Sequence, residues 1–122
     1  MLPKGRRIAL EFRHPSWYAP AVLDLLTGQN VALCISDHHD APAPWEVTAN
    51  FAYVRGHGPG GRYVDRYASG ELTRWAKRIG EWIAGGRDVY AYFDNDIDGA
   101  APLDAHDLKT ALGQCGDGVF EG

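Results

Sequence analysis

The chain has 122 residues, with 12 Lys and Arg against 16 Asp and Glu, so its formal net charge is −4. This acidic balance disfavours general electrostatic attraction to nucleic acid or acidic lipid. The hydrophobic content of 45% is too high for a disordered chain. No apolar run approaches the roughly 20 residues of a membrane span. The start of the chain, MLPKGRR, has no apolar signal-peptide core, and two cysteines make no disulfide framework. We therefore expect one cytoplasmic globular domain with no membrane partner.

Strand and helix signals alternate along the chain. Segments rich in β-branched and aromatic residues predict strands at residues 7–13, 30–37, 51–57 and 88–94. Apolar residues at helical spacing predict helices at residues 16–27, 69–85 and 102–112. A polar, Pro-bearing loop at residues 37–50 stands where a further helix is expected, and residues 113–122 are expected to form a flexible tail. This alternation implies a parallel sheet with right-handed crossovers.

The two faces of the predicted strands differ in character. One face is apolar and suits the packing of helices. The other becomes polar toward the carboxyl ends of the strands, where it carries Glu11, Arg13, Arg55, His57 and Asp94. A doubly wound sheet covers both faces with helices and prefers apolar residues on each. A barrel keeps its helices outside and its chemistry at the C-terminal mouth, so the pattern favours a barrel.

Three motifs resemble a known family. Residues 11–17 read EFRHPSW, residues 48–63 read TANFAYVRGHGPGGRY, and residues 89–96 read VYAYFDND, followed by APLDAHDL. Together and in this order they closely resemble the C-terminal half of the YecE-like family, domain of unknown function 72, over about residues 8–112. The resemblance implies a TIM-barrel-like fold. The family domain is about twice this length, in keeping with the 200 or more residues that a (β/α)₈ barrel typically needs.

The resemblance and the strand pattern together predict an α/β fold that is half of a TIM-type (β/α)₈ barrel. It has four parallel strands with outer helices, in a single domain over residues 1–122 with its core at about 7–112. Four strands cannot close on themselves, so the outer strands at residues 7–13 and 88–94 present unpaired edges. We therefore expect self-association or a complementing N-terminal half-barrel as partner.

The polar mouth of this half-barrel is predicted to hold Glu11, Arg13, Asp37, Arg55, His57, Asp94 and Asn95. Glu11, His57 and Asp94 are the candidate catalytic residues, because carboxylates and imidazoles act as general acids and bases. The competing hypothesis is a structural network of ion pairs that plugs the barrel. A divalent metal held by His57 and the carboxylates of Asp94 and Asp96, near Glu11, is a less favoured alternative.

A second group of residues is predicted to bind an anion. Arginine forms charge-assisted hydrogen bonds with anions, and glycines let backbone amides approach one closely. The candidates are Arg13, Arg55, Gly58, Gly60, Gly61, Arg62, Tyr63 and Asn95. The alternative for the glycine segment is a tight turn that leads the chain away from its strand.

Other residues receive structural predictions. Trp75 and Trp82 lie seven residues apart in one predicted helix, so both are expected to pack against the sheet. Cys34 lies in the middle of a predicted strand and does not resemble a nucleophile. No metal site is assigned to His38 and His39, because adjacent histidines on an exposed loop are expected to point apart.

The leading functional hypothesis is a hydrolase or lyase that acts on a small anionic or phosphorylated substrate. One alternative is phosphodiester chemistry on nucleic acid, which the acidic charge disfavours. Another is an inactive half-domain that binds a ligand or complements a partner half. The sequence assigns no cofactor.

Overall fold

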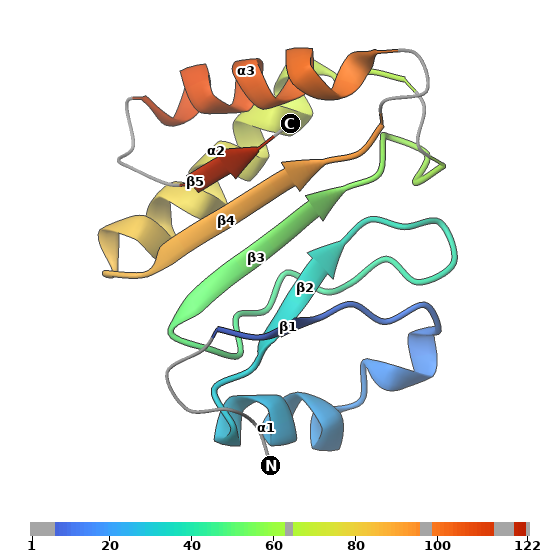
Figure 1. Ribbon diagram of the computed structural model, residues 1–122, viewed down its shortest axis with the longest axis vertical. Coiled ribbons are helices and arrows are strands. Elements are labelled where there is room, and N and C mark those ends of the chain that lie inside the picture. The colour runs from blue at the N-terminus through green and yellow to red at the C-terminus, as the bar shows by residue number, and fades with distance from the viewer. Residues whose placement is uncertain (1–6, 63–64, 96–98, 114–118, 122) are drawn as a thin grey trace.

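The computed structural model of the protein describes residues 7–62, 65–95, 99–113 and 119–121. Its strands are β1 (Ala9–Leu10), β2 (Ala32–Ser36), β3 (Phe51–Gly56), β4 (Asp88–Phe93) and β5 (Val119–Glu121). Its helices are the short 3₁₀ helix η1 (Pro15–Trp17) and the α-helices α1 (Pro20–Gly28), α2 (Ser69–Ala84) and α3 (Ala100–Leu112). The strands form one sheet in the order β1-β2-β3-β4-β5, and all neighbours run parallel (Figure 1).

This strand order is that of a barrel wall. Each strand pairs with the next strand of the chain, without the reversal of order that marks a doubly wound sheet. The two ends of the sheet, β1 and β5, lie apart in Figure 1, so the described strands form an open arc. The four predicted strands and the half-barrel fold are confirmed.

A fifth strand occupies part of the predicted tail. Residues 113–122 were expected to be flexible, but Val119–Glu121 form β5 and pair with β4 in the register Tyr90↔Val119. Residues 114–118 and 122 lie outside the described residues. The correction has a physical reason, because the edge of β4 offers unpaired N–H and C=O groups that a further strand can satisfy. The edge strands are therefore β1 and β5, not β4.

The first helix begins later than predicted. The chain forms η1 at Pro15–Trp17, and α1 starts only at Pro20, its first helical residue. Proline lacks an N–H and clashes with a preceding helical turn, so it belongs in a first turn. The first strand is also shorter than predicted, since it ends at Leu10 and leaves Glu11 and Arg13 beyond its carboxyl end.

Helices α2 and α3 cover the outer face of β3 and β4. The core between them contains Val54, Leu72, Ile79, Val89 and Leu108, each at most 2% exposed. A smaller apolar cluster joins α1 to β2. The apolar face of the strands is therefore the helix-covered one, as the sequence pattern predicted.

The loop at residues 37–50 takes the place of a helix between β2 and β3. Its Trp45 stacks on Trp82 with ring centroids 5.7 Å apart and meets Trp75 at 5.4 Å. Trp75 is 8% exposed and stacks on Phe93 of β4, as predicted. Trp82 is only partly buried. The prediction that both tryptophans are buried against the sheet holds for Trp75, whereas Trp82 is only partly buried and stacks on Trp45 of the loop.

The inner face of the sheet is lined by aromatic side chains. Tyr53 stacks on Tyr92 at 5.1 Å and lies 6.5 Å from the ring of Tyr90. A hollow of about 280 Å³ opens on this face, and only residues of the sheet and its N-terminal approach line it: Arg7, Ala9, Phe51, Tyr53, Tyr90 and Tyr92. The inner face is thus apolar in its middle and charged at its carboxyl edge.

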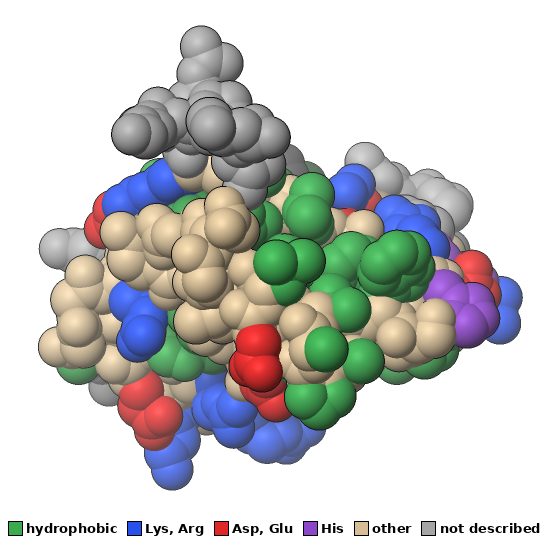
Figure 2. Space-filling model, turned by 90° about the horizontal axis from the view of Figure 1, so that it is seen from below, with side chains coloured by type: hydrophobic (Ala, Val, Ile, Leu, Met, Phe, Trp, Pro, Cys, Tyr) green, Lys and Arg blue, Asp and Glu red, His purple; other side chains and the backbone are tan. Residues whose placement is uncertain are grey.

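Large apolar side chains are also exposed near β1 and α1. Leu10, Trp17 and Leu25 are 43%, 52% and 65% exposed. Figure 2 views the molecule from below, the side on which Figure 1 places α1, and shows hydrophobic side chains gathered between charged ones. Among the described residues, no helix combines the length and the apolarity that crossing a bilayer demands.

Candidate functional site

The carboxyl ends of the parallel strands bring the charged residues of the predicted mouth together. Glu11 and Arg13 follow β1, Arg55 lies near the end of β3, His57 follows β3, and Asp94 follows β4. Parallel strands end at the same edge of a sheet, which explains why residues far apart in the chain meet here. We call these five residues the mouth network.

His57 lies at the centre of the mouth network. Its side chain is fully buried, with Nε2 3.2 Å from Glu11 Oε2 and Nδ1 2.7 Å from Asp94 Oδ1. A neutral imidazole carries one N–H, whereas the imidazolium donates from both nitrogens. One ring thus contacts two carboxylates, one that follows the edge strand β1 and one that follows β4.

Two arginines complete the network. Arg55 donates from Nη1 to Glu11 Oε1 at 3.2 Å and from Nε to Asp94 Oδ2 at 3.1 Å, and its Nη2 lies 2.9 Å from the same Asp94 oxygen. Arg13 Nε donates to Glu11 Oε2 at 2.7 Å. The side chains of Arg13 and Arg55 are 47% and 39% exposed, whereas that of Glu11 is 13% exposed. The arginines therefore form the solvent side of the site.

The electrostatics of Glu11 follow from these contacts. Burial raises its pKa, but the hydrogen bond from His57 and the charges of His57, Arg13 and Arg55 outweigh burial and lower the pKa from 4.5 to about 2. Cys34 Sγ donates to Glu11 Oε1 at 3.6 Å. Burial, followed by the charge of Glu11, raises the pKa of this thiol. Glu11 is thus a carboxylate at neutral pH and Cys34 a protonated thiol.

Asp37 and Tyr67 hold the chain at His57. Asp37 Oδ1 accepts the backbone N–H of His57 at 2.6 Å, and its other oxygen accepts a short hydrogen bond from the Tyr67 hydroxyl. That hydroxyl accepts the N–H of Gly58 at 2.9 Å. Burial raises the pKa of Asp37, although the hydrogen bonds from Tyr67 and His57 oppose the rise. Asp37 and Tyr67 therefore fix the backbone at His57 and Gly58.

The glycine segment forms a tight turn. Gly58 has φ of 102° and Gly61 has φ of 71°. The N–H of Gly58 is held by Tyr67, and that of Gly61 donates to Gly58 O at 2.8 Å. Two of the predicted anion-binding amides are thus used within the protein, which corrects that interpretation for Gly58 and Gly61. Gly60 and Arg62 are exposed, and Tyr63 lies outside the described residues.

Asn95 lies beneath the mouth network rather than in it. It is fully buried, and its amide donates to Asp65 O at 2.6 Å and to Asp104 Oδ2 at 2.7 Å. Asp104 also accepts the N–H of Tyr67. Asn95 therefore braces the loops after β3 and β4, and the prediction that it binds an anion does not fit this placement.

Sequence reasoning missed Tyr67 and Asp104. Asp104 lies three residues after Ala101 and four before Leu108, on the buried stripe of α3. A carboxylate on an apolar stripe is a signal that a buried hydrogen-bond partner exists. No comparable pattern marks Tyr67, whose role depends on the turn that brings it to Asp37.

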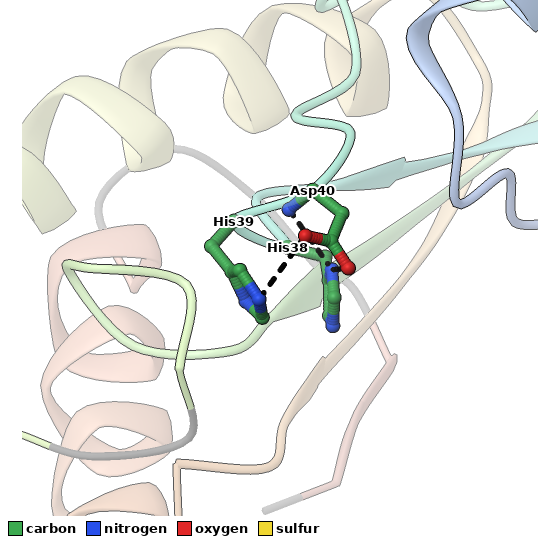
Figure 3. A group of neighbouring side chains, drawn as sticks. All are labelled: His38, His39 and Asp40. Carbon is green, nitrogen blue, oxygen red and sulfur yellow. Dashed lines mark hydrogen bonds and ion pairs between the residues drawn. The ribbon is translucent and has the colours of Figure 1, made fainter.

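His38 and His39 do not point apart, which corrects the premise of the sequence analysis. Their rings lie 4.3 Å apart, and His38 is 4% exposed rather than on an open loop. With Asp40 they form a close group at the end of β2 (Figure 3). The ring of His38 also meets that of His57 edge-on at 5.2 Å, and burial lowers the pKa of His38.

Comparison with known proteins agrees with the half-barrel. Residues 1–121 match the family described as Protein of unknown function DUF72. The chain belongs to the DUF72 family. No curated protein matches the chain.

Two solved DUF72 structures resemble this chain. A DUF72 family protein from Enterococcus faecalis is 23% identical, with a TM-score of 0.78 over 93% of this chain and 50% of its own. One from Thermotoga maritima is 24% identical, with a TM-score of 0.80 over 89% of this chain and 47% of its own. The chain thus spans about half the length of these structures. The family's description assigns no activity. The comparisons therefore establish the fold, and any activity has to be inferred from the residues of the site.

Proposed function

We propose that the mouth network is the catalytic centre of a hydrolase or lyase for a small anionic or phosphorylated substrate. The observation that supports this proposal is the buried imidazole of His57 between Glu11 and Asp94, at 3.2 and 2.7 Å. Coupled acid–base groups at the C-terminal mouth of a barrel wall are typical of enzymes built on this fold.

The exposure of each group suggests its role. Arg13 and Arg55 are the most exposed of the network and supply the positive charge for an anion. Asp94 and Glu11 are 23% and 13% exposed, so their carboxylates reach a bound substrate and move its protons. His57 is fully buried and serves as a positioning residue that shares a proton between the two carboxylates.

Titration with inorganic phosphate tests the anion site. We expect phosphate to raise the melting temperature of the wild-type chain, and Arg55→Ala to weaken phosphate binding about ten- to a hundredfold, as loss of a charge-assisted hydrogen bond implies. Arg55→Lys keeps the positive charge but loses the planar guanidinium group that donates to both Glu11 and Asp94. Arg87→Ala is the matched control, because Arg87 precedes β4 at the opposite edge of the sheet.

The same titration separates the two hypotheses for the network. If Arg55 only neutralises buried carboxylates, Arg55→Ala lowers the stability strongly and wild-type phosphate affinity is absent. A wild-type chain that gains no stability at tens of millimolar phosphate contradicts the proposed anion site. Circular dichroism of each variant shows whether it is folded before binding is compared.

We also propose that the inner face is completed by a second DUF72 half-barrel. The aromatic hollow of about 280 Å³ and the exposed Leu10, Trp17 and Leu25 support this proposal. Exposed apolar patches of this kind mark interaction sites. The matched structures are about twice as long as this chain, so a half-barrel of similar size is the partner that the fold accommodates.

Light scattering on the 122-residue chain tests this second proposal. Without a complementing half, the chain is expected to self-associate through its open edges and inner face. Tyr53→Lys, in the hollow, is expected to shift the chain toward monomer, whereas Leu103→Lys on the outer side of α3 is not. A well-dispersed wild-type monomer at tens of micromolar contradicts the proposal.

A further inference from the structure

His38, His39 and Asp40 form a second polar group beside the mouth network. One nitrogen of each ring and one carboxylate oxygen lie within 4.8 Å of one another. His39 Nε2 is 3.2 Å from Asp40 Oδ1, and His38 Nδ1 is 3.9 Å from Asp40 Oδ2. Figure 3 shows all three side chains on one turn, with the carboxylate facing both rings.

Hydrogen bonds to the chain orient both rings. His39 Nδ1 lies 2.9 Å from the carbonyl oxygen of Gly61, which can only accept, so this nitrogen carries the proton and the lone pair of a neutral ring is on Nε2. The backbone N–H of Asp40 donates to the in-plane lone pair of His38 Nδ1 at 3.2 Å, so a metal ion bound to this nitrogen takes the place of that N–H. The lone pairs of His39 Nε2 and His38 Nδ1 therefore both lie at Asp40 and its carboxylate.

With the proton of His39 on Nδ1, the Nε2 lone pair and Asp40 Oδ1 are two acceptors 3.2 Å apart, and a cation between them removes their repulsion. Two ligand atoms bound to one zinc ion at about 2.1 Å and at tetrahedral angles are about 3.4 Å apart. The 3.2 Å from His39 Nε2 to Asp40 Oδ1 is close to that value, and the 3.9 Å from His38 Nδ1 to the other carboxylate oxygen, Oδ2, is longer. A metal-bound histidine also commonly donates its other N–H to a backbone carbonyl, as His39 does to Gly61.

The turn that carries these residues packs closely against the glycine segment. A Cβ at Gly61 would lie 2.4 Å from both Asp37 O and His39 N, so the two loops touch through their backbones. His38 is 4% exposed, whereas the Asp40 side chain is 60% exposed. One ligand is thus fixed in the protein interior and another faces solvent, an arrangement that leaves an ion accessible.

We propose that His38, His39 and Asp40 bind a divalent transition metal ion of the zinc type. Two imidazoles and one carboxylate provide three ligands, and a water molecule takes the fourth position of a tetrahedral site. The site is separate from the mouth network and does not depend on its proposed chemistry. It gives the DUF72 half-barrel a metal-binding function at the carboxyl end of β2.

Calorimetry with Zn²⁺ at neutral pH tests the proposal on a chain without a histidine tag. Cys115 is replaced by Ser in every sample, so that this thiol does not compete for the ion. We expect one ion per chain, and a loss of affinity of at least about tenfold in Asp40→Asn and in His39→Gln. Both positions are accessible enough for the variants to fold, and a Co²⁺ absorption spectrum gives a second readout of ligand geometry.

Matched controls are Asp24→Asn on α1 and His106→Gln on α3, both exposed residues. These two variants are expected to bind Zn²⁺ as the wild type does. Lack of stoichiometric binding up to about 1 mM Zn²⁺ would show that His39 and Asp40 form only an ion pair, and would overturn the proposal. Equal affinity in the wild type and Asp40→Asn would place the ion elsewhere and overturn it as well.

Discussion

Replacing Glu11 by Gln removes the carboxylate on which the mouth network converges. Glu11 accepts contacts from Arg13, Arg55 and His57, while Gln keeps the shape and loses the charge. The variant is therefore expected to be less stable at neutral pH. Because two arginines lose an anionic partner and the His57 ring loses a carboxylate, its destabilisation should exceed that of an ordinary exposed Glu→Gln change.

The magnitude follows from the pKa of Glu11, which falls from 4.5 to about 2 on folding. At about 1.4 kcal/mol per pKa unit, this difference corresponds to about 3 kcal/mol of folding free energy. A lowered pKa stabilises the folded state fully above about pH 4.5, and the stabilisation is lost as the pH falls toward 2. In a chain of this length, the loss lowers the melting temperature by roughly 10 °C.

Urea unfolding followed by tryptophan fluorescence measures this effect at pH 7, 5, 3.5 and 2.5. The wild type and Glu11→Gln should differ most at pH 7 and 5 and converge toward pH 2. Glu46→Gln, at an exposed loop position, is the control and should track the wild type. A difference between Glu11→Gln and wild type that stays below about 1 kcal/mol at pH 7 would refute the reasoning.

Three further predictions concern packing, backbone conformation and thiol chemistry. Trp75→Ala should cost about 3–5 kcal/mol of unfolding free energy, and Trp82→Ala clearly less, because Trp75 is buried and stacks on Phe93 whereas Trp82 is only partly buried; equal losses in urea unfolding would contradict this. Gly61→Ala should lower the melting temperature, since its φ of 71° and a Cβ 2.4 Å from Asp37 O leave no room; an unchanged value would argue against the turn. Cys34 should resist alkylation in the native chain and react once urea unfolds it, because it is 2% exposed and its pKa is raised; rapid native labelling, read by mass spectrometry, would contradict its burial.

Local pattern was enough to predict a parallel barrel wall, and the resemblance to the YecE-like family identified it as half of a barrel. Alternating strand and helix signals predict parallel pairing, and a strand with one apolar and one charged face predicts which side the helices cover. These features depend on the side-chain period of each element, which a sequence displays directly. The fifth strand was not predicted, because a segment of three residues is too short to show the alternation of side chains that marks a strand. Its pairing depends on the free edge of β4.

The sequence also placed Glu11, Arg55, His57 and Asp94 at one edge of the sheet, because the carboxyl ends of parallel strands meet there. Which ring nitrogen faces which carboxylate depends on the registers that bring β1, β3 and β4 into one sheet, such as the pairing of Arg55 with Tyr92.

The remaining features depend on contacts between loops. Asn95 is drawn beneath the site by Asp104 of α3, and the carbonyl of Gly61 turns the ring of His39 toward Asp40. Such contacts join segments with no common period, and each forms only after the sheet has brought its loops to the same edge. For that physical reason the tertiary structure alone decided how these side chains point.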